Sequence, residues 1–307
     1  MSKKHPPQHA TTAEGQSEQL HLPVLLDKVV ELLAPQPGQT YLDLTAGYGG
    51  HAKAIIDRIG SAQTVTLVDR DENAIRELET LKQSGAEVVH DDFASFAERA
   101  VAAGKRYDMV LVDLGVSSPQ LDRAERGFSI QNDGPLDMRM DPRQELSALS
   151  LVNRTREAEL ARIIEEYGEE RPRQAARIAH AIVLARPLRT TTDLAKAVMS
   201  THRGRWEKTH PATRTFQAIR IAINDELGQV KRMLAAVPQL LTEGGRVAII
   251  SFHSLEDRLV KRAFQEQARA GYEAELELLT KKAIQGRTDD VHNPRARSAT
   301  LRVAVKK

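Results

Sequence analysis

Between residues 41 and 112, short apolar segments alternate with segments of helical periodicity. The apolar segments are typical of strands buried on both faces: Tyr41–Thr45, Thr64–Val68, Glu87–His90 and Tyr107–Val112. Helices are expected between them at Gly50–Ile59, Glu72–Leu81 and Phe93–Val101. Strands that alternate with helices predict a parallel, doubly wound sheet, so the expected fold class is α/β.

The alternation stops after the fourth expected strand and resumes later in the chain. Segment 121–210 has helical periodicity only, which predicts an all-helical insertion. Residues 1–19 contain almost no apolar side chains and are expected to form a disordered tail. The sequence therefore predicts a tail (1–19), a Rossmann-like domain made of 20–120 and 211–307, and a helical domain (121–210) inserted into it.

The net charge of +2 conceals two basic regions. From Arg171 to Arg220 there are 11 Lys and Arg against two Asp and Glu, and from Lys281 to Lys307 there are eight against two. The remaining residues carry a net charge of −13. Such a distribution is either the footprint of a polyanion or a set of solvated helix faces whose arginines pair with carboxylates elsewhere.

A glycine-rich loop, Gly47-Tyr-Gly49-Gly50-His51, follows the first expected strand. Glycine lets the backbone turn sharply and approach a ligand at the amino terminus of the next helix. Asp69 ends the second strand, 22 residues after Gly47, where an acidic residue binds ribose hydroxyls in nucleotide-binding sheets. The loop also satisfies the dinucleotide pattern, so these residues leave both NAD and S-adenosylmethionine open as the ligand.

Two more side chains follow expected strands at the edge where such sheets bind ligands. Phe93 is placed either to stack on an adenine or to join the core through the following helix. Asp113 is either a functional carboxylate or a turn-forming residue, and a carboxylate at the end of a buried strand is costly without a partner or a role.

The chain contains no cysteine. This excludes disulfides, thiolate zinc sites, iron–sulfur clusters and cysteine nucleophiles, and it is consistent with a cytoplasmic protein. No run of 18 apolar residues is present, so no membrane span is expected. No spacing typical of metal ligands is apparent, so no metal is expected either.

Seven longer motifs resemble the ribosomal RNA small subunit methyltransferase H family. They occur in order along the chain: Asp113-Leu-Gly-Val-Ser-Ser-Pro-Gln-Leu-Asp122, Arg126-Gly-Phe-Ser129, Gly134-Pro-Leu-Asp-Met-Arg-Met-Asp141, Tyr167-Gly-Glu-Glu-Arg171, His210-Pro-Ala-Thr-Arg-Thr-Phe-Gln217, Ser251-Phe-His-Ser-Leu-Glu-Asp-Arg258 and Asn293-Pro-Arg-Ala-Arg-Ser298. The similarity extends from about His21 to Val305. One departure is Ala283 after Lys282, where the family usually has proline.

The resemblance implies a class I S-adenosylmethionine-dependent methyltransferase with a helical domain inserted after the fourth strand. The implied reaction is methyl transfer to N4 of a cytidine in the decoding region of 16S ribosomal RNA, with the small ribosomal subunit as the partner. The implied cofactor contacts are Gly49, Gly50, His51, Asp69, Phe93, Asp113 and Gln120.

An exocyclic amine is a poor nucleophile, and it needs in-line placement on the methyl group and an acceptor for its hydrogens. Asp113 is the predicted acceptor, with His253 and Glu256 as second candidates. Many amino-methyltransferases have Asn/Asp-Pro-Pro-aromatic after the fourth strand, whereas this chain has Ser117-Ser118-Pro119-Gln120. Methylation of a ribose 2′-hydroxyl and a non-catalytic role in ribosome assembly stay open as alternatives.

Overall fold

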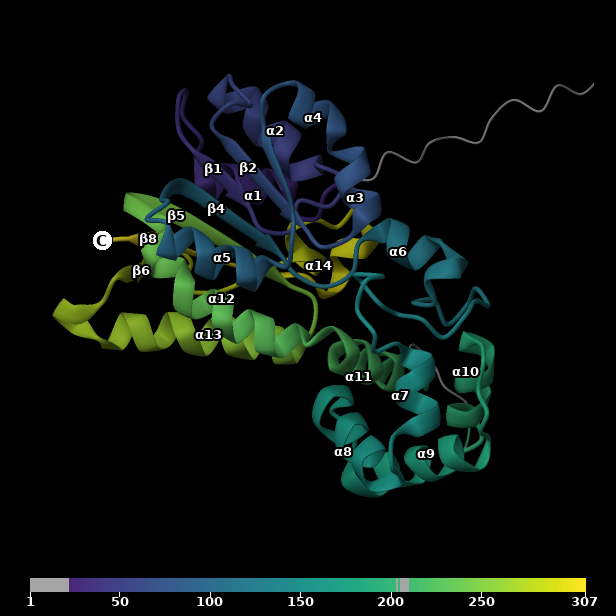
Figure 1. Ribbon diagram of the computed structural model, residues 1–307. Coiled ribbons are helices and arrows are strands. Elements are labelled where there is room, and N and C mark those ends of the chain that lie inside the picture. The colour runs from purple at the N-terminus through teal and green to yellow at the C-terminus, as the bar shows by residue number, and fades with distance from the viewer. Residues whose placement is uncertain (1–21, 203, 205–209) are drawn as a thin grey trace, which may run out of the picture.

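The computed structural model describes residues 22–202, 204 and 210–307. The expected disordered tail lies outside these residues. The chain folds into a sheet unit and a helical unit that lie side by side, joined through α11 (Thr213–Asn224) and α12 (Glu226–Leu240) (Figure 1).

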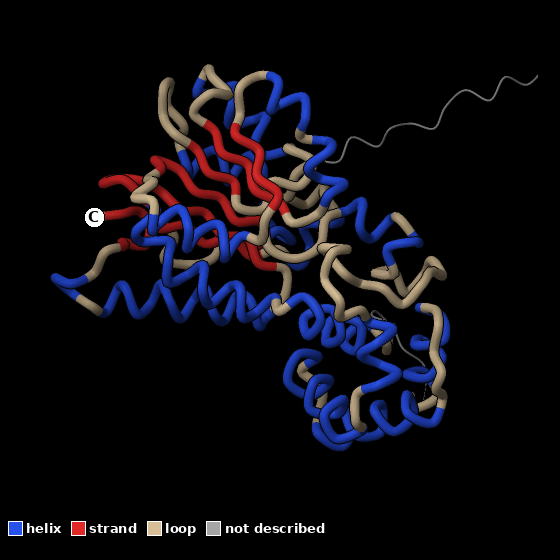
Figure 2. The backbone as a smooth tube through the Cα atoms, viewed as in Figure 1, coloured by secondary structure: helices blue, strands red, loops and turns tan. Residues whose placement is uncertain are grey.

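The centre of the sheet unit is an eight-stranded sheet in the order β3-β2-β1-β4-β5-β8-β6, with β7 paired to β8 (Figure 2). The first five strands of this order are parallel, whereas β8 is antiparallel to its neighbours. The strands are β1 Tyr41–Asp43, β2 Val65–Asp69, β3 Glu87–His90, β4 Tyr107–Asp113, β5 Leu241–Ser251, β6 Leu276–Leu278, β7 Ile284–Gln285 and β8 Thr300–Lys306.

Helices cover both faces of the sheet, because successive strand residues point to opposite sides. In β4, Met109 and Leu111 pack in the cluster that contains α1 (Leu26–Leu33) and α2 (Gly50–Ile59). Val110 and Val112 pack on the other face, with α5 (Phe93–Ala102), α12 (Glu226–Leu240) and α13 (Ser254–Arg269). This two-sided burial confirms the expected α/β doubly wound fold.

The helical unit has its own apolar core. It is built from α7 (Ala148–Arg154), α8 (Glu157–Gly168), α9 (Pro172–Leu184), α10 (Thr191–Met199) and α11 (Thr213–Asn224). Phe216 and Ile219 of α11 belong to this core. The sequence instead predicts that the sheet domain resumes at residue 211 and includes this helix. The packing of α11 favours a boundary at Asp225, whose left-handed backbone (φ 47°) separates α11 from α12.

Several local expectations differ from the structure. Segment 121–147 contains only the end of α6 (Ser118–Asp122) and the short helix η1 (Ala124–Arg126), followed by loops, because Gly127, Gly134 and two prolines interrupt the helical periodicity. The helix expected at Glu72–Leu81 divides at Leu78 into α3 (Glu72–Glu77) and α4 (Glu79–Gln83).

The short remaining elements lie near the carboxyl end of the chain: η2 (Gly271–Glu273), α14 (Gly286–Asp289) and η3 (Pro294–Ser298). This segment contacts the start of the described chain, since Asp290 accepts a hydrogen bond of 2.8 Å from the Leu25 amide. Among the helices of the described residues, none has the length and apolarity that a membrane crossing requires.

Candidate active site

The carboxyl ends of the parallel strands bring three aspartates to one edge of the sheet. Asp43 ends β1, Asp69 ends β2 and Asp113 ends β4. The strand order reverses direction between β1 and β4, and open α/β sheets bind ligands in the crevice at such a point. The candidate site is therefore this edge.

The glycine loop enters the site between β1 and α2. Gly47 and Gly49 have φ of 52° and 76°, a region that favours glycine. A Cβ added to Gly50 would lie 2.6 Å from Pro23 Cγ, so the loop also packs closely against the segment before α1. The loop places the amino terminus of α2 at the crevice, as phosphate- and nucleotide-binding loops do.

Asp69 fixes this loop in place. One carboxylate oxygen accepts the Gly47 amide and the other accepts the Asp71 amide, each at 2.8 Å. Burial raises the pKa of Asp69 to about 6, and these two hydrogen bonds oppose the increase. Each oxygen has a second lone pair, so Asp69 is able to accept ligand hydroxyls as well.

Asp113 faces His51, the second residue of α2. Asp113 Oδ2 lies 3.8 Å from His51 Nδ1, and Asp113 Oδ1 is buried without a hydrogen-bond partner. Burial raises the pKa of Asp113 well above its ordinary value, and the nearby Asp43 and Glu256 carboxylates add to this. A buried carboxylate oxygen without a hydrogen-bond partner is costly, which makes Asp113 a candidate functional group.

Asp43 is the most enclosed of the three aspartates, with 1% of its surface exposed. Its carboxylate accepts the Tyr41 hydroxyl at 2.8 Å and the Thr45 amide at 3.1 Å. Burial raises the pKa of Asp43 to about 7, and the nearby Asp69 carboxylate contributes to the increase. Asp43 therefore places a third carboxyl group beneath the crevice, although its own oxygens are occupied.

Gln120 is held in a buried polar network. Its side-chain oxygen accepts the Ser117 amide at 2.9 Å, and its amide nitrogen donates to Asp71 Oδ2 at 2.8 Å. The same Asp71 oxygen accepts Arg126 Nη1 at 2.6 Å, and both partners are largely buried. The network ties the loop after β2 to the start of the helical insertion, so in this structure Gln120 orders the rim of the site.

Phe93 is the first residue of α5, which begins directly after β3 and is capped by Asp92. Its half-buried ring packs against the core on the α5 face of the sheet. The ring therefore lies at the same edge as Asp69, whose strand pairs with β3 through His90.

The second candidates, His253 and Glu256, have structural roles at the start of α13. His253 is the N-cap residue and Glu256 accepts the Phe252 amide at 2.8 Å. His253, Glu256 and Glu226 present ligand-type atoms within 4.8 Å of one another. Arg220 donates two hydrogen bonds of 2.8 Å to Glu226, so a guanidinium already supplies positive charge to this cluster.

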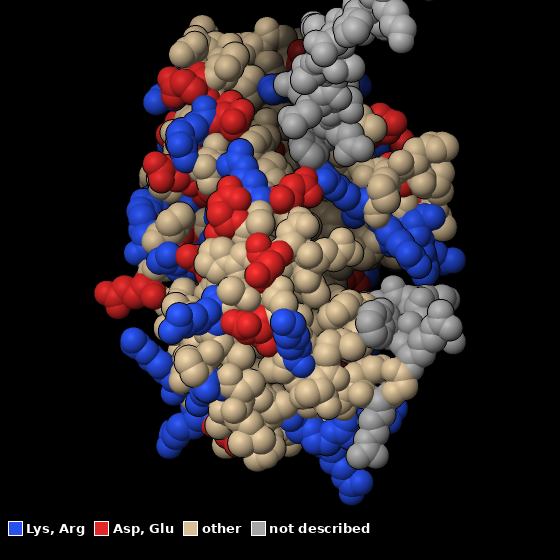
Figure 3. Space-filling model, turned by 90° about the vertical axis from the view of Figure 1, so that its right-hand side faces the viewer, with Lys and Arg blue, Asp and Glu red and all other residues tan. Residues whose placement is uncertain are grey.

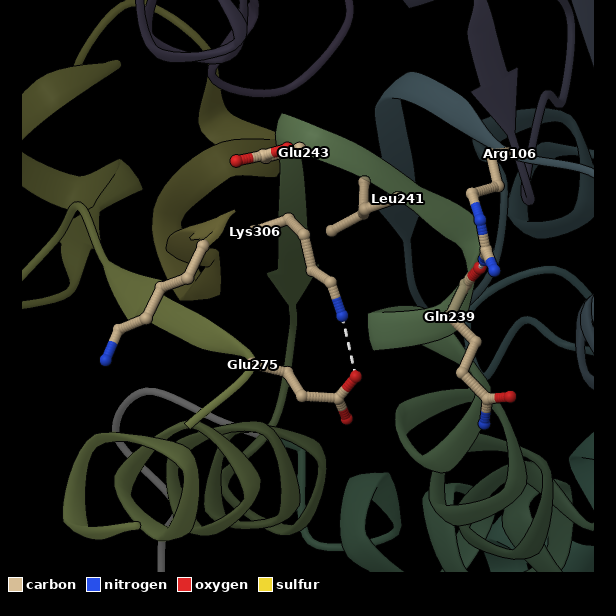
Figure 4. A pocket seen from close by; sticks show the side chains of 7 residues that line it. Arg106, Gln239, Leu241, Glu243, Glu275 and Lys306 are labelled. Atoms are coloured by element: carbon tan, nitrogen blue, oxygen red, sulfur yellow. Dashed lines mark hydrogen bonds and ion pairs between the residues drawn. The ribbon is translucent and has the colours of Figure 1, made fainter. Parts of the chain in front are cut away.

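Another hollow lies at the opposite edge of the sheet (Figure 4). Its lining side chains come from the end of α12, the amino ends of β4 and β5, the residue before β6 and the carboxyl end of β8: Arg106, Gln239, Leu241, Glu243, Glu275, Lys306 and Lys307. Lys306 donates to Glu275 at 2.6 Å across it. The hollow contains none of the predicted site residues.

Comparison with known proteins identifies the family to which this chain belongs. The model of the MraW methylase family matches residues 18–307. The chain belongs to the MraW methylase family. The family resemblance inferred from the motifs is thereby confirmed, and the chain is a methyltransferase that uses S-adenosylmethionine as the methyl donor. An NAD-dependent enzyme is set aside.

Similar relatives of this MraW methylase include three proteins named ribosomal RNA small subunit methyltransferase H. The protein from Synechocystis is 46% identical over 93% of this chain and 93% of its own length. That from Acidobacterium capsulatum is 46% identical over 94% and 98%, and that from Koribacter versatilis is 45% identical over 94% and 94%. The similarity thus covers nearly the whole of both chains.

The residues at the crevice suit the methyl donor. The glycine loop at the start of α2 and the Asp69 carboxylate are the types of group that nucleotide-binding sheets use at this edge, and Asp113 is a further polar side chain there. Three residues of this site were not identified from the sequence as such: Asp43, Asp71 and Arg126. Arg126 begins the Arg-Gly-Phe-Ser motif, which was the available signal.

Proposed function

We propose that this MraW methylase transfers a methyl group from S-adenosylmethionine to N4 of a cytidine in the decoding region of 16S ribosomal RNA, in the small ribosomal subunit and in the cytoplasm. Family membership over residues 18–307 supports the RNA substrate. The observation that supports the chemistry concerns Asp113. Its carboxylate lies where the strand order reverses between β1 and β4, and one of its oxygens is buried without a hydrogen-bond partner.

In this proposal the residues of the crevice divide into two groups. The first group holds or encloses S-adenosylmethionine, which supplies an electrophilic methyl group when bound: Gly49, Gly50, His51, Asp69, Phe93 and Gln120. Asp113 contacts the donor and accepts a hydrogen of the target amine. An acceptor in that position aligns the nitrogen lone pair with the methyl group and takes up the proton released by transfer.

The absence of cysteine supports an amine as the target over carbon 5 of the pyrimidine ring. Carbon 5 is a weak nucleophile, and enzymes that methylate it commonly add a cysteine thiolate to the ring first. Methylation of a ribose 2′-hydroxyl commonly requires a lysine-assisted base. The side chains that face Asp113 in the described chain are acidic or neutral: Asp43, Glu256 and His51. This environment favours the amine.

The proposal is tested by incubating the purified protein with small ribosomal subunits and labelled S-adenosylmethionine, followed by nucleoside mass spectrometry. Label in N4-methylcytidine is expected. Label only in 2′-O-methylcytidine would support the ribose alternative, and binding of subunits without any label would support a non-catalytic assembly factor. Protein-free 16S RNA assayed in parallel shows whether the assembled subunit is required.

The contribution of Asp69 to donor binding is testable separately. Asp69→Ala is expected to weaken binding of S-adenosylmethionine about tenfold or more, because hydrogen bonds to a charged acceptor contribute roughly 1.5–3 kcal/mol. Isothermal titration calorimetry measures the change. Glu72→Ala is the control, since it removes an exposed carboxylate near the same loop. Equal affinity of the two variants would contradict this role of Asp69.

We further propose that the helical unit binds the RNA. Figure 3 shows Lys and Arg side chains gathered over the lower part of the molecule, where acidic side chains are sparse. Exposed basic residues of this unit include Arg171, Arg173, Arg177, Arg189 and Lys196. In the C-terminal basic region, by contrast, Arg302 and Lys306 are paired with Asp257 and Glu275. The helical unit therefore offers an exposed positive surface to the RNA.

Arg173 and Arg177 are four residues apart on α9 and lie on one exposed face. Replacing both with alanine is expected to weaken RNA binding and to reduce the slope of log K against log salt by about 1 for each phosphate that is no longer neutralised. Filter binding at several salt concentrations measures this slope. Arg162→Ala is the matched control, because Arg162 is already paired with Glu159. An unaltered slope in the double variant would place the RNA elsewhere.

A further inference from the structure

His51 has a side-chain environment that its position in the glycine loop does not require. Its ring is 7% exposed, and Nε2 lies 3.0 Å from the carbonyl oxygen of Val24. A carbonyl oxygen only accepts hydrogen bonds, so Nε2 carries the ring hydrogen. Burial lowers the pKa of His51 to about 4, and the ring is therefore neutral near pH 7. Nδ1 is left with a lone pair.

That lone pair faces Asp113 Oδ2 at 3.8 Å. An ionised carboxylate and a lone pair repel one another, whereas a protonated carboxyl group is able to donate to Nδ1. The other groups facing Asp113 act in the same direction, because Asp43 on β1 and Glu256 on α13 are both acidic. No Lys or Arg forms an ion pair with Asp113 within the described ranges of the chain. The protein groups around Asp113 thus favour its protonated form, although a quarter of the side chain is exposed to solvent.

We propose that His51 is a positioning residue: its Nδ1 accepts a hydrogen bond from the protonated form of Asp113 and thereby makes Asp113 a stronger base. This inference rests on the proposed function, since it concerns the same site. The distance of 3.8 Å exceeds a hydrogen bond, and catalytic contacts of this kind commonly shorten only when the substrate is bound.

Methyl transfer releases one proton, and the two side chains account for it. The amine nitrogen forms a bond to the methyl carbon and displaces the thioether, which keeps the electron pair of the broken C–S bond. The amine then loses one proton to Asp113 Oδ2, and the resulting carboxyl group donates to His51 Nδ1. His51 stays neutral throughout, and water takes the proton from Asp113 after the product leaves.

Two variants of His51 separate this role from a structural one. His51→Gln places an amide near the position of Nε2, which keeps the donor to Val24 and removes the acceptor that faces Asp113. His51→Asn places an amide near the position of Nδ1, which keeps an acceptor for Asp113 and removes the contact with Val24. A purely structural histidine depends on the Val24 contact, so the two hypotheses predict opposite behaviour for this pair.

The decisive measurement is the pH dependence of kcat, and in particular its acidic limb, the range in which kcat falls as the pH decreases. Below this limb Asp113 is already protonated and cannot accept the amine proton. In His51→Gln the limb is expected to move to lower pH by about one unit, because a neutral hydrogen bond to the protonated form is lost. The maximal kcat is expected to fall as well, since the base is weaker. In His51→Asn the limb is expected to stay close to that of the wild type.

Infrared spectroscopy provides a readout that is independent of the RNA. The carbonyl stretch of protonated Asp113 is identified by its loss in Asp113→Asn, and its titration midpoint is expected to be lower in His51→Gln than in the wild type. A midpoint and a limb that are unchanged or raised in His51→Gln would overturn the inference. Wild-type protein that makes no N4-methylcytidine would instead overturn the proposed function, whatever the His51 variants do.

Discussion

Asp113→Asn is expected to lower kcat for methyl transfer by about 10²- to 10⁴-fold, the usual contribution of a positioned acid or base. Asparagine has the same shape and keeps an oxygen acceptor, so it is able to orient the amine. It cannot take up the proton that transfer releases. Single-turnover assays with small ribosomal subunits at saturating S-adenosylmethionine measure the change.

Donor affinity distinguishes this role of Asp113 from a contact with the donor alone. Calorimetry is expected to show that the affinity of Asp113→Asn for S-adenosylmethionine is within a few-fold of the wild-type value, because the neutral side chain retains its polar contacts. The matched control is Asp57→Asn, the same substitution at an exposed position of α2. A normal rate in Asp113→Asn would exclude Asp113 as the proton acceptor.

The sheet could be predicted from the sequence because its strands are short, apolar and separated by clear helical segments. The expected and observed limits of Glu87–His90 and Gly50–Ile59 agree, and those of Tyr107–Asp113 differ by one residue. Parallel strands also place their carboxyl ends together, so Asp69 and Asp113 could be assigned to one edge. Local periodicity and general topology were sufficient for both conclusions.

The limits of the helical insertion could not be predicted in the same way. The periodicity of α11 is that of any amphipathic helix, and it does not reveal which of two cores receives Phe216 and Ile219. The loops of 127–147 depend on long-range contacts, such as the bond of 2.9 Å from the Met140 amide to the Asn224 side chain. Contacts between distant segments leave no periodic pattern in the sequence.

The hydrogen-bond arrangement within the site also could not be predicted from the sequence. Gln120 was inferred from a motif to contact the methyl donor. The motif gave no indication that the Gln120 side chain donates a hydrogen bond to Asp71 and caps α6. The sequence likewise placed His51 and Asp113 in one site without indicating which ring nitrogen faces the carboxylate. The Val24 carbonyl determines this orientation, and Val24 precedes the loop by more than 20 residues.

The joint between the two units depends on Arg220 at the end of α11. Its guanidinium forms two hydrogen bonds of 2.8 Å with Glu226 at the start of α12, and the two side chains are only 16% and 6% exposed. Burial alone would lower the pKa of Arg220, but the Glu226 carboxylate raises it. The Glu256 carboxylate also lies in the field of this guanidinium. Arg220 therefore offsets two buried negative charges.

Arg220→Met is expected to destabilise the protein by about 3–5 kcal/mol, because it leaves Glu226 buried without its partner. Chemical denaturation followed by circular dichroism measures the loss. Arg162→Met, which breaks the exposed pair with Glu159, is expected to have a much smaller effect, because solvent screens that pair. Adding Glu226→Leu to Arg220→Met removes the uncompensated carboxylate and is expected to restore part of the stability. If the double variant is instead less stable than Arg220→Met alone, the pair acts through its packing and not through its charge.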